Sequence, residues 1–349
     1  MHVVLPEGVG DPERPSGGNV YDRRLCRGLA DAGWTVEERT VPGDWPGADA
    51  GARRALGDEL GSVPDGATVL VDGLLASAAP EVVVPQAARL RLCVLVHLPL
   101  GAASGEEPVR AAERAVLLAA AGVLTTSAWC RGWLLEHYGL AAERVHVAEP
   151  GVDPAPLAPG TTAGNRLLCV AAVTPGKGHD LLVRALSRLT ELPWSCVCVG
   201  SLARDPGHVD RLRALTRDVG LAGRVRLTGP RVGEALDAAY AGADLLVLAS
   251  RFESYGMVVT EALARGVPVL TTAVGGLPGT VGRLPDGTRP GLLVPPDDPD
   301  ALTEALRRWL CDAELRRSLR EAARSRRTAL AGWDATSERV ARALAVATW

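Results

Sequence analysis

The chain alternates short apolar runs with longer segments in which apolar residues recur every three or four positions. Runs such as ATVLVDG, LCVLVHLP and ADLLVLAS are almost continuously apolar, which is typical of buried parallel strands. The segments 20–32, 107–121, 180–190, 206–219 and 233–241 have the spacing of amphipathic helices. The pattern therefore predicts an α/β protein with parallel sheets covered by helices on both faces.

This alternation occurs twice, on either side of the stretch PAPLAPGTTAG, whose Pro, Gly and Ala content is typical of a linker. A length of 349 residues also exceeds that of one ordinary domain. We predict a Rossmann-like domain over residues 1–158, a second over 159–333, and a C-terminal helix over 334–349. Ligands of such sheets bind at the carboxyl ends of the strands, so we expect the two sheets to face a common crevice.

The segment SRFESYGMVVTEALARGVPVLTT, residues 250–272, reads as a turn, a helix and a further strand. The first N–H groups of such a helix form an anion site, which Gly256 lets a ligand approach and Ser254 can cap. Glu253 lies on the elbow, and Glu261 lies about two turns further along. Either acid alone is as readily a solvated surface residue. Their joint placement favours binding of neutral hydroxyl groups that flank a phosphate.

Lys177 is the only lysine among 38 basic residues and lies in the Gly-rich turn TPGKG after an apolar strand. A lysine there would balance phosphate charge as a compact cation, although an exposed turn lysine is the simpler alternative. The spacing of a P-loop is missing. Gly17 and Gly18 precede a helix in the same way, but a glycine pair is more often only a turn. His97 ends a strand and is expected to face the crevice, with no carboxylate partner within its motif.

The sequence offers no metal-ligand spacing, so we expect no metal site. Asp298 and Asp300 precede a helix, where acids act as caps. The remaining histidines are read as incidental; they are His2, His137, His146, His179 and His208. The seven cysteines form no CxxC pair and are expected to be buried, reduced thiols.

Composition excludes several classes of protein. A formal net charge of -3 argues against a nucleic-acid partner. No apolar run is long enough to span a bilayer, and the N-terminus lacks a secretory signal. We therefore expect a cytoplasmic protein without stable membrane insertion; a homodimer stays an open alternative to a monomer.

Several motifs in this order resemble family 4 of the glycosyltransferases, which are retaining enzymes of the GT-B fold. They are the glycine pair, VHLP with His97, EPGVD, KG, ESYGMVVTEALARGVPV, VGGLP and GLLVPPDDPDAL. The resemblance implies that His97, Lys177 and Glu253 are catalytic, with Glu253 binding a hydroxyl of the donor sugar. It further implies donor-binding roles for these residues: Gly17, Gly18, Lys177, Ser254, Tyr255, Gly256, Met257, Val258 and Glu261, the last with the ribose. The C-terminal helix would return to the first domain.

The implied function is metal-independent transfer, with retention, from a nucleotide diphosphate sugar, a UDP-sugar by expectation, to a small soluble acceptor. No further cofactor is implied, and the composition suggests secondary metabolism. Two departures from the family pattern are Gly279 and Ala172; the latter replaces an arginine of the diphosphate site, for which Arg204 and Arg231 are candidates. A non-catalytic binding protein and a nucleotide-sugar epimerase are alternative functions.

Overall fold

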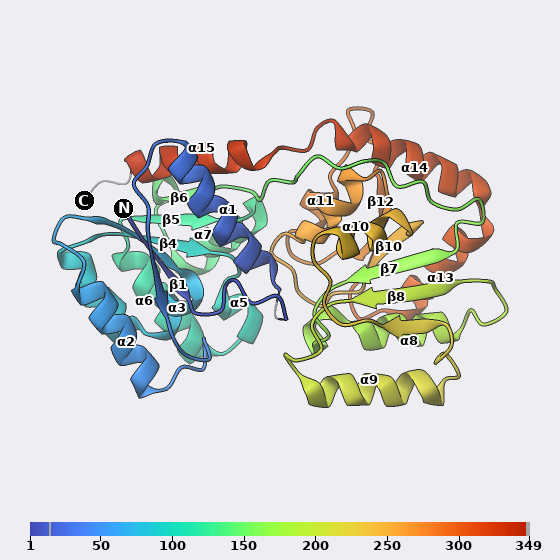
Figure 1. Ribbon diagram of the computed structural model, residues 1–349, viewed down its shortest axis with the longest axis horizontal. Coiled ribbons are helices and arrows are strands. Elements are labelled where there is room, and N and C mark those ends of the chain that lie inside the picture. The colour runs from blue at the N-terminus through green and yellow to red at the C-terminus, as the bar shows by residue number, and fades with distance from the viewer. Residues whose placement is uncertain (14, 347–349) are drawn as a thin grey trace. The chain divides into compact units, whose positions relative to one another are not determined.

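The computed structural model describes residues 1–13 and 15–346, which form two compact units (Figure 1). Unit 1 contains Met1–Val9, Gly18–Gly151 and the described residues from Ala331 onward, and unit 2 contains Gly10–Gly17 and Val152–Leu330. The units thus divide after Gly151 and Leu330, where the sequence suggested 158 and 333. Residues 347–349 of the expected last helix lie outside the described residues.

Six parallel strands form the sheet of unit 1 in the order β2-β1-β3-β4-β5-β6. The strands are β1 (His2–Pro6), β2 (Glu37–Val41), β3 (Thr68–Asp72), β4 (Arg91–Val96), β5 (Gly122–Thr125) and β6 (Val145–Val147). The helices are α1 (Gly17–Asp31), α2 (Ala50–Gly61), α3 (Gly73–Ala78), α4 (Pro80–Val83), η1 (Val84–Ala88), α5 (Leu100–Ser104), α6 (Glu107–Ala119), α7 (Ala128–Tyr138), η2 (Ala142–Arg144) and α15 (Trp333–Val346).

Both faces of this sheet are covered, as the near-continuous apolar strands predict. Successive residues of β4 point to opposite faces: Val94 joins one buried cluster with residues of α2, α3, α6 and α7. Its neighbour Leu95 joins another cluster, which contains Leu25 of α1 and Val340 of α15. Helix α15 is further anchored by the Thr336 hydroxyl, which donates to the carbonyl of Glu149 (2.8 Å).

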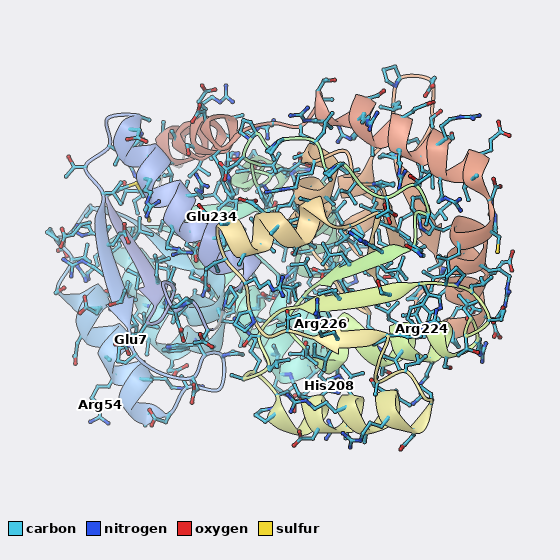
Figure 2. The ribbon with its side chains drawn as sticks, turned by 45° about the vertical axis from the view of Figure 1, so that its right-hand side comes forward. Glu7, Arg54, His208, Arg224, Arg226 and Glu234 are labelled. Atoms are coloured by element: carbon cyan, nitrogen blue, oxygen red, sulfur yellow. The ribbon has the colours of Figure 1, made fainter. Side chains whose placement is uncertain are left out.

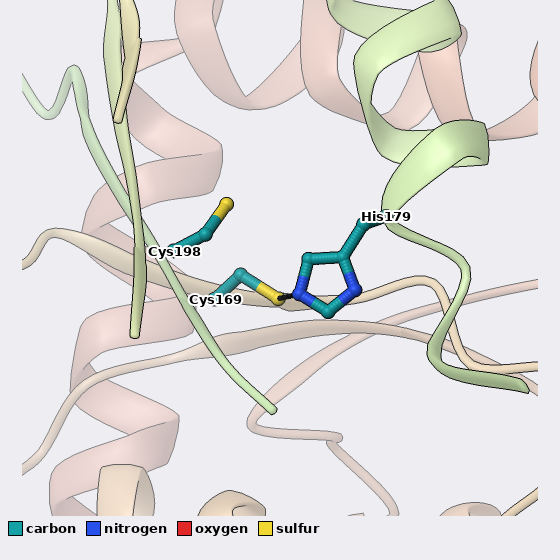
Figure 3. A group of neighbouring side chains, drawn as sticks. All are labelled: Cys169, His179 and Cys198. Carbon is teal, nitrogen blue, oxygen red and sulfur yellow. Dashed lines mark hydrogen bonds between the residues drawn. The ribbon is translucent and has the colours of Figure 1, made fainter. Parts of the chain in front are cut away.

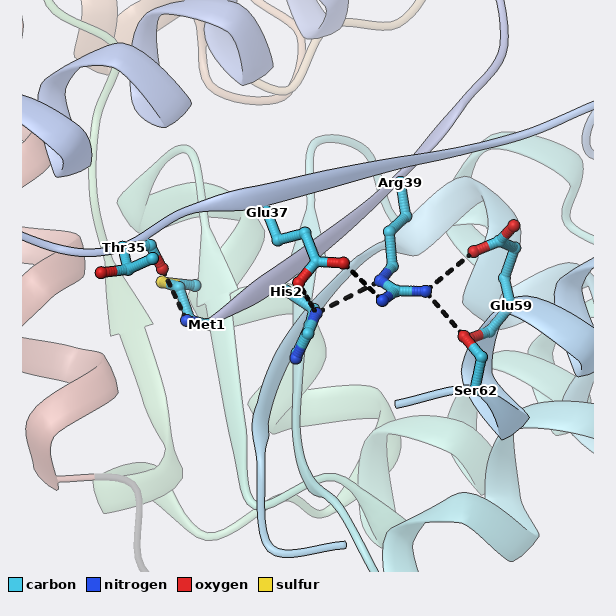
Figure 4. Close-up of polar contacts among 7 residues, drawn as sticks. All are labelled: Met1, His2, Thr35, Glu37, Arg39, Glu59 and Ser62. Carbon is cyan, nitrogen blue, oxygen red and sulfur yellow. Dashed lines mark hydrogen bonds and ion pairs between the residues drawn. The ribbon is translucent and has the colours of Figure 1, made fainter. Parts of the chain in front are cut away.

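Charged side chains line the edge strand β2, a feature that disfavours pairing with a further strand. Arg39 donates to carboxylates of Glu37 (2.5 Å) and Glu59 (3.2 Å) and to the Ser62 hydroxyl (2.7 Å). The terminal amine of Met1 donates to a backbone carbonyl in the segment before β2 (2.7 Å). Figure 4 shows this network, which fixes the start of the chain to the edge of the sheet.

Unit 2 has a second sheet of six parallel strands in the order β12-β11-β10-β7-β8-β9. The strands are β7 (Arg166–Val170), β8 (Ser195–Val199), β9 (Val225–Leu227), β10 (Leu245–Leu248), β11 (Val269–Thr272) and β12 (Gly291–Val294). The helices are η3 (Pro175–Lys177), α8 (His179–Ser187), α9 (Pro206–Asp218), α10 (Glu234–Ala241), α11 (Met257–Ala264), α12 (Leu277–Val281), α13 (Pro299–Cys311) and α14 (Ala313–Arg327).

Cation stacking and caps hold the connections of unit 2. Arg224, labelled in Figure 2, lies over the ring of Trp194 at 3.7 Å and donates to the Trp194 carbonyl (3.2 Å). Asp298 caps α13 by accepting from the N–H of Ala301 (2.8 Å), which confirms the capping interpretation of this acid. Among the helices of residues 1–13 and 15–346, none is both long and apolar enough to cross a membrane.

Candidate functional site

A glycine turn brings Lys177 to the end of strand β10 in unit 2. Gly178 has a φ of 65°, and a Cβ there would lie 1.9 Å from the carbonyl oxygen of Ala249. The backbone N–H of Arg251 donates to the carbonyl of Gly176 (2.8 Å). Only glycine allows this close approach, so the KG pair fixes the lysine turn against the segment that follows β10.

Lys177 and Glu253 form a direct ion pair. The ammonium Nζ lies 2.6 Å from Glu253 Oε1, and the hydroxyl of Ser250 donates to the same oxygen (3.1 Å). The lysine side chain is 31% exposed and the glutamate 13%, so the pair is reachable from solvent. The two residues predicted for diphosphate and sugar contacts are therefore neighbours. Ser250 is a partner that sequence reasoning missed.

The elbow at residues 253–256 is shaped by the glycines of the VGGLP motif. A Cβ at Gly275 would lie 1.8 Å from the carbonyl oxygen of Glu253, and one at Gly276 would lie 1.9 Å from that of Ser254. The N–H of Gly276 donates to the Glu253 carbonyl (2.9 Å), and the Thr280 hydroxyl donates to the Tyr255 carbonyl (2.6 Å). The motif thus acts as a backbone support for the elbow.

Helix α11 begins after Gly256, which has a φ of 86° and packs against Leu277. The N-cap is this glycine, so the prediction that Ser254 caps the helix is wrong: the left-handed turn at Gly256 sets the helix start. Met257 and Val258 supply the first helical N–H groups, where the positive end of the helix dipole favours an anion. A Cβ at Gly17, which belongs to unit 2, would lie 3.3 Å from Met257 Sδ.

Glu261 lies about one turn into the same helix, where it accepts a hydrogen bond from Tyr240 of α10. The buried Tyr240 hydroxyl donates to Glu261 Oε2 (2.7 Å) and contacts the Val258 carbonyl (3.4 Å). Burial raises the pKa of Glu261, an effect that the hydrogen bond from Tyr240 opposes. The tyrosine fixes the orientation of the carboxylate. Its role was not predicted from the sequence.

Arg251 is the cation that the structure places beside the Lys177 turn, whereas sequence analysis considered Arg204 and Arg231. It donates to both carboxylate oxygens of Asp180 (2.8 Å each), to the Pro175 carbonyl (2.6 Å) and to Asp297 (2.7 Å). The bonds to Asp180 raise the pKa of Arg251, which is therefore fully charged. The guanidinium ties this turn to the start of α8, so its first role is structural.

In unit 1, His97 contacts two carboxylates. Its Nε2 lies 2.7 Å from Asp22 Oδ1 and 3.7 Å from Asp72 Oδ2, and both acids are buried. Both carboxylates come from outside the VHLP motif, within which none was expected. Asp72 ends β3, which pairs with β4 directly before His97, and Asp22 lies in α1 after β1. Parallel topology gathers the three residues, which lie far apart in the sequence.

This group has unusual acid–base properties. Burial lowers the pKa of His97, but the charge of Asp22 and its hydrogen bond outweigh that effect and raise it to about 9. Burial and the neighbouring Asp22 raise the pKa of Asp72 to about 7. A Cβ at Gly18 would lie 3.4 Å from His97 Cδ2, so this predicted glycine borders the imidazole.

Two groups of side chains could hold a metal ion among the described residues, although no spacing in the sequence indicated one. One is Asp22, Asp72 and His97, in which the protonated imidazole competes with a cation. The other is Cys169, His179 and Cys198 in the core of unit 2. Six of the seven cysteines are buried free thiols, which agrees with their predicted state; Cys311 is exposed.

Comparison with known families gives a match in each half of the chain. The family description "Glycosyltransferase Family 4" covers residues 15–156, and "Glycosyl transferases group 1" covers residues 161–326. The D-inositol 3-phosphate glycosyltransferase of Kineococcus radiotolerans is 36% identical over 230 residues, 59% of this chain and 52% of that protein. D-inositol 3-phosphate glycosyltransferase 1 of Catenulispora acidiphila is 35% identical over 257 residues, 68% of this chain and 59% of that protein. The chain thus spans little more than half the length of these relatives.

Solved structures confirm the predicted fold. Sucrose-phosphate synthase from Thermosynechococcus elongatus superposes with a TM-score of 0.80 at 24% identity, covering 98% of both chains. Anabaena HepE, solved in complex with UDP-glucose, superposes with a TM-score of 0.76 at 18% identity, covering 99% of both chains. The two six-stranded parallel sheets are therefore those of the GT-B fold.

Proposed function

We propose that this chain, which belongs to the glycosyltransferase families matched by its two halves, transfers a sugar from a UDP-sugar to a small soluble acceptor. The contact between Lys177 and Glu253 at the start of α11 carries the proposal. It joins a cation and helical N–H groups, which suit a diphosphate, to a carboxylate, which suits a sugar hydroxyl.

The donor would bind along α11. Lys177 and the N–H groups of residues 255–258 would bind the diphosphate, and Glu261 would accept from the ribose hydroxyls in the orientation that Tyr240 fixes. Negative charge grows on the departing UDP, so preorganised donors at this point stabilise the transition state most. The lysine and the helix start would take the place of a divalent cation, and we propose that transfer needs none.

Retention of the anomeric configuration is part of this proposal. An inverting reaction requires a general base to deprotonate the acceptor on the face opposite the leaving group. Burial lowers the pKa of His97, but the charges of Asp22 and Asp72 raise it to about 9, which favours the form of the ring that donates hydrogen bonds. We propose that the leaving phosphate helps to deprotonate the acceptor on the same face, with His97 as a further catalytic residue of unit 1.

The first acceptors and the first donor to test are proposed from proteins that this chain resembles. The curated relatives are named for D-inositol 3-phosphate, which makes phosphorylated and free cyclitols the first acceptors to test. UDP-glucose is the first donor to test, because the HepE structure contains it. A role in secondary metabolism stays a prediction from composition.

A single experiment separates the proposal from its alternatives. The purified chain is incubated with UDP-sugars in the absence and then in the presence of cyclitol acceptors, and all products are identified by mass spectrometry and sugar chromatography. Acceptor-dependent release of UDP with a glycosylated product supports the proposal. Interconversion of UDP-sugars without acceptor would instead identify an epimerase, and donor binding without turnover in any mixture would identify a binding protein.

A further inference from the structure

Three buried side chains of unit 2 converge beneath the Lys177 turn. Cys169 lies on β7 and Cys198 on β8, at positions directly opposite each other, and His179 is the first residue of α8. They are 1%, 3% and 1% exposed, respectively. The ligand atoms of the three residues, which Figure 3 labels, all lie within 4.8 Å of one another.

The spacing of these atoms suits one metal ion. Cys169 Sγ lies 3.6 Å from His179 Nε2. A tetrahedral zinc ion, with bonds of about 2.3 Å to sulfur and about 2.0 Å to nitrogen, holds two such ligands about 3.5 Å apart. The ion would therefore fit between the observed positions with small side-chain movements.

The ring of His179 has few hydrogen-bond partners. Within the described part of the chain its buried Nδ1 has no hydrogen-bond partner, and Nε2 has only the long contact with the Cys169 sulfur. An ion bound at Nε2 would occupy the nitrogen that faces Cys169, while Nδ1 lies away from that contact.

The chemistry of the donors selects the metal. Thiolate and imidazole ligands favour zinc over magnesium or calcium, which prefer oxygen. Two thiolates cancel the charge of a divalent ion, so a complex with neutral His179 can be buried without a net charge. Cys196 offers a further thiol, with its sulfur 4.0 Å from that of Cys198.

We propose that Cys169, His179 and Cys198 form a structural zinc site in the core of unit 2. Binding releases the protons of the two thiols to solvent and forms two sulfur–zinc bonds and one nitrogen–zinc bond. The ion fixes the first residue of α8 to β7 and β8, and so holds the adjacent Lys177–Gly178 turn. This site is separate from the proposed sugar chemistry and is tested by metal content rather than by turnover.

Zinc content of the whole chain tests the proposal. The untagged protein is produced in zinc-supplemented medium, purified without chelators, and measured by elemental mass spectrometry. We expect close to one zinc ion per chain, and a loss of at least about tenfold in Cys198→Ala and His179→Gln, since each removes one of three ligands. Cys93→Ala is the matched control, because it removes a buried thiol on β4 of unit 1 and should keep the zinc.

X-ray absorption at the zinc edge of the unaltered chain gives an answer that does not depend on the variants folding. Sulfur neighbours at about 2.3 Å with a nitrogen neighbour at about 2.0 Å support the site. A shell of only oxygen and nitrogen, a zinc content at background level, or a disulfide between Cys169 and Cys198 in the purified protein would each overturn it.

Discussion

Lys177 Nζ and Glu253 Oε1 lie 2.6 Å apart. The turn that carries Lys177 packs, at Gly178, against the backbone that precedes Glu253. The lysine charge is therefore compensated by the residue assigned to the sugar hydroxyl. On the proposed function, the two residues exchange partners when the donor binds. The ammonium of Lys177 then contacts the diphosphate, and the carboxylate of Glu253 accepts a hydrogen bond from a sugar hydroxyl. The pair thereby preorganises both groups before the donor arrives, which lowers the cost of ordering them in the transition state.

Lys177→Ala should lower kcat by about 100- to 1000-fold in a folded protein, because a preorganised donor at the leaving group is lost. Lys177→Arg should restore activity only in part, since the planar guanidinium is larger than the ammonium and Glu253 lies at contact distance. Initial rates with saturating donor measure the effect. Arg213→Ala, which removes an exposed cation of unit 2, is the control and should be neutral; equal rates for Lys177→Ala and this control would refute the role.

Tyr240→Phe should raise the KM for the donor by about tenfold while kcat stays near the original value, because the hydroxyl orients a binding group rather than a reacting one. The comparison variant is Tyr138→Phe, which removes a buried hydroxyl that donates to Glu113 (2.6 Å) in unit 1. Both variants lose one tyrosine–glutamate hydrogen bond. A donor KM that changes equally in the two would show that Glu261 has no special role.

Gly276→Ala should lower the free energy of unfolding by about 1–3 kcal/mol, because its Cβ would overlap the Ser254 carbonyl oxygen. The elbow must shift, so donor affinity should fall as well. Gly279→Ala, three residues further along in α12, is the control: a Cβ there has open space, so stability should change by less than about 0.5 kcal/mol. Chemical denaturation and donor titration of both variants check this; indistinguishable variants would contradict the close approach.

The stability of unit 1 should fall as pH rises between 6.5 and about 9. The folded-state pKa of His97 is raised from 6.5 to about 9, so its stabilisation is present below 6.5 and is lost through that window. Asp72, raised from 3.8 to about 7, changes stability in the same direction at lower pH. His97→Gln should flatten the upper part of the curve, as measured by denaturant unfolding at several pH values. A wild-type curve that rises with pH would contradict the assignment.

The sequence predicted the fold and much of the donor half because those features are local. Apolar strands followed by glycine turns and helix starts place Lys177 and Glu253 at strand ends wherever the sheet folds in parallel. Ser254 is a plausible cap from the sequence alone, but the left-handed conformation of Gly256, which packs against Leu277 of VGGLP, sets the start of α11.

Partners that come from other strands were not predictable in the same way. Asp22 and Asp72 reach His97 only through the strand order β1-β3-β4, and Tyr240 reaches Glu261 from another helix. Cys169, His179 and Cys198 have no recognisable spacing, because β7–β8 pairing and the first turn of α8 create their proximity. A topology-based search for polar residues at the ends of neighbouring strands would have found Asp72.

The anomeric configuration of the product tests the central claim most directly. The chain is incubated with UDP-glucose, whose sugar is α-linked, and a cyclitol or cyclitol phosphate, and the product is examined by proton NMR. The account predicts an α-linked product, identified by its small anomeric coupling constant, whose formation falls at least about 100-fold in Lys177→Ala. A β-linked product would contradict it, because the α configuration of the donor would then have been inverted.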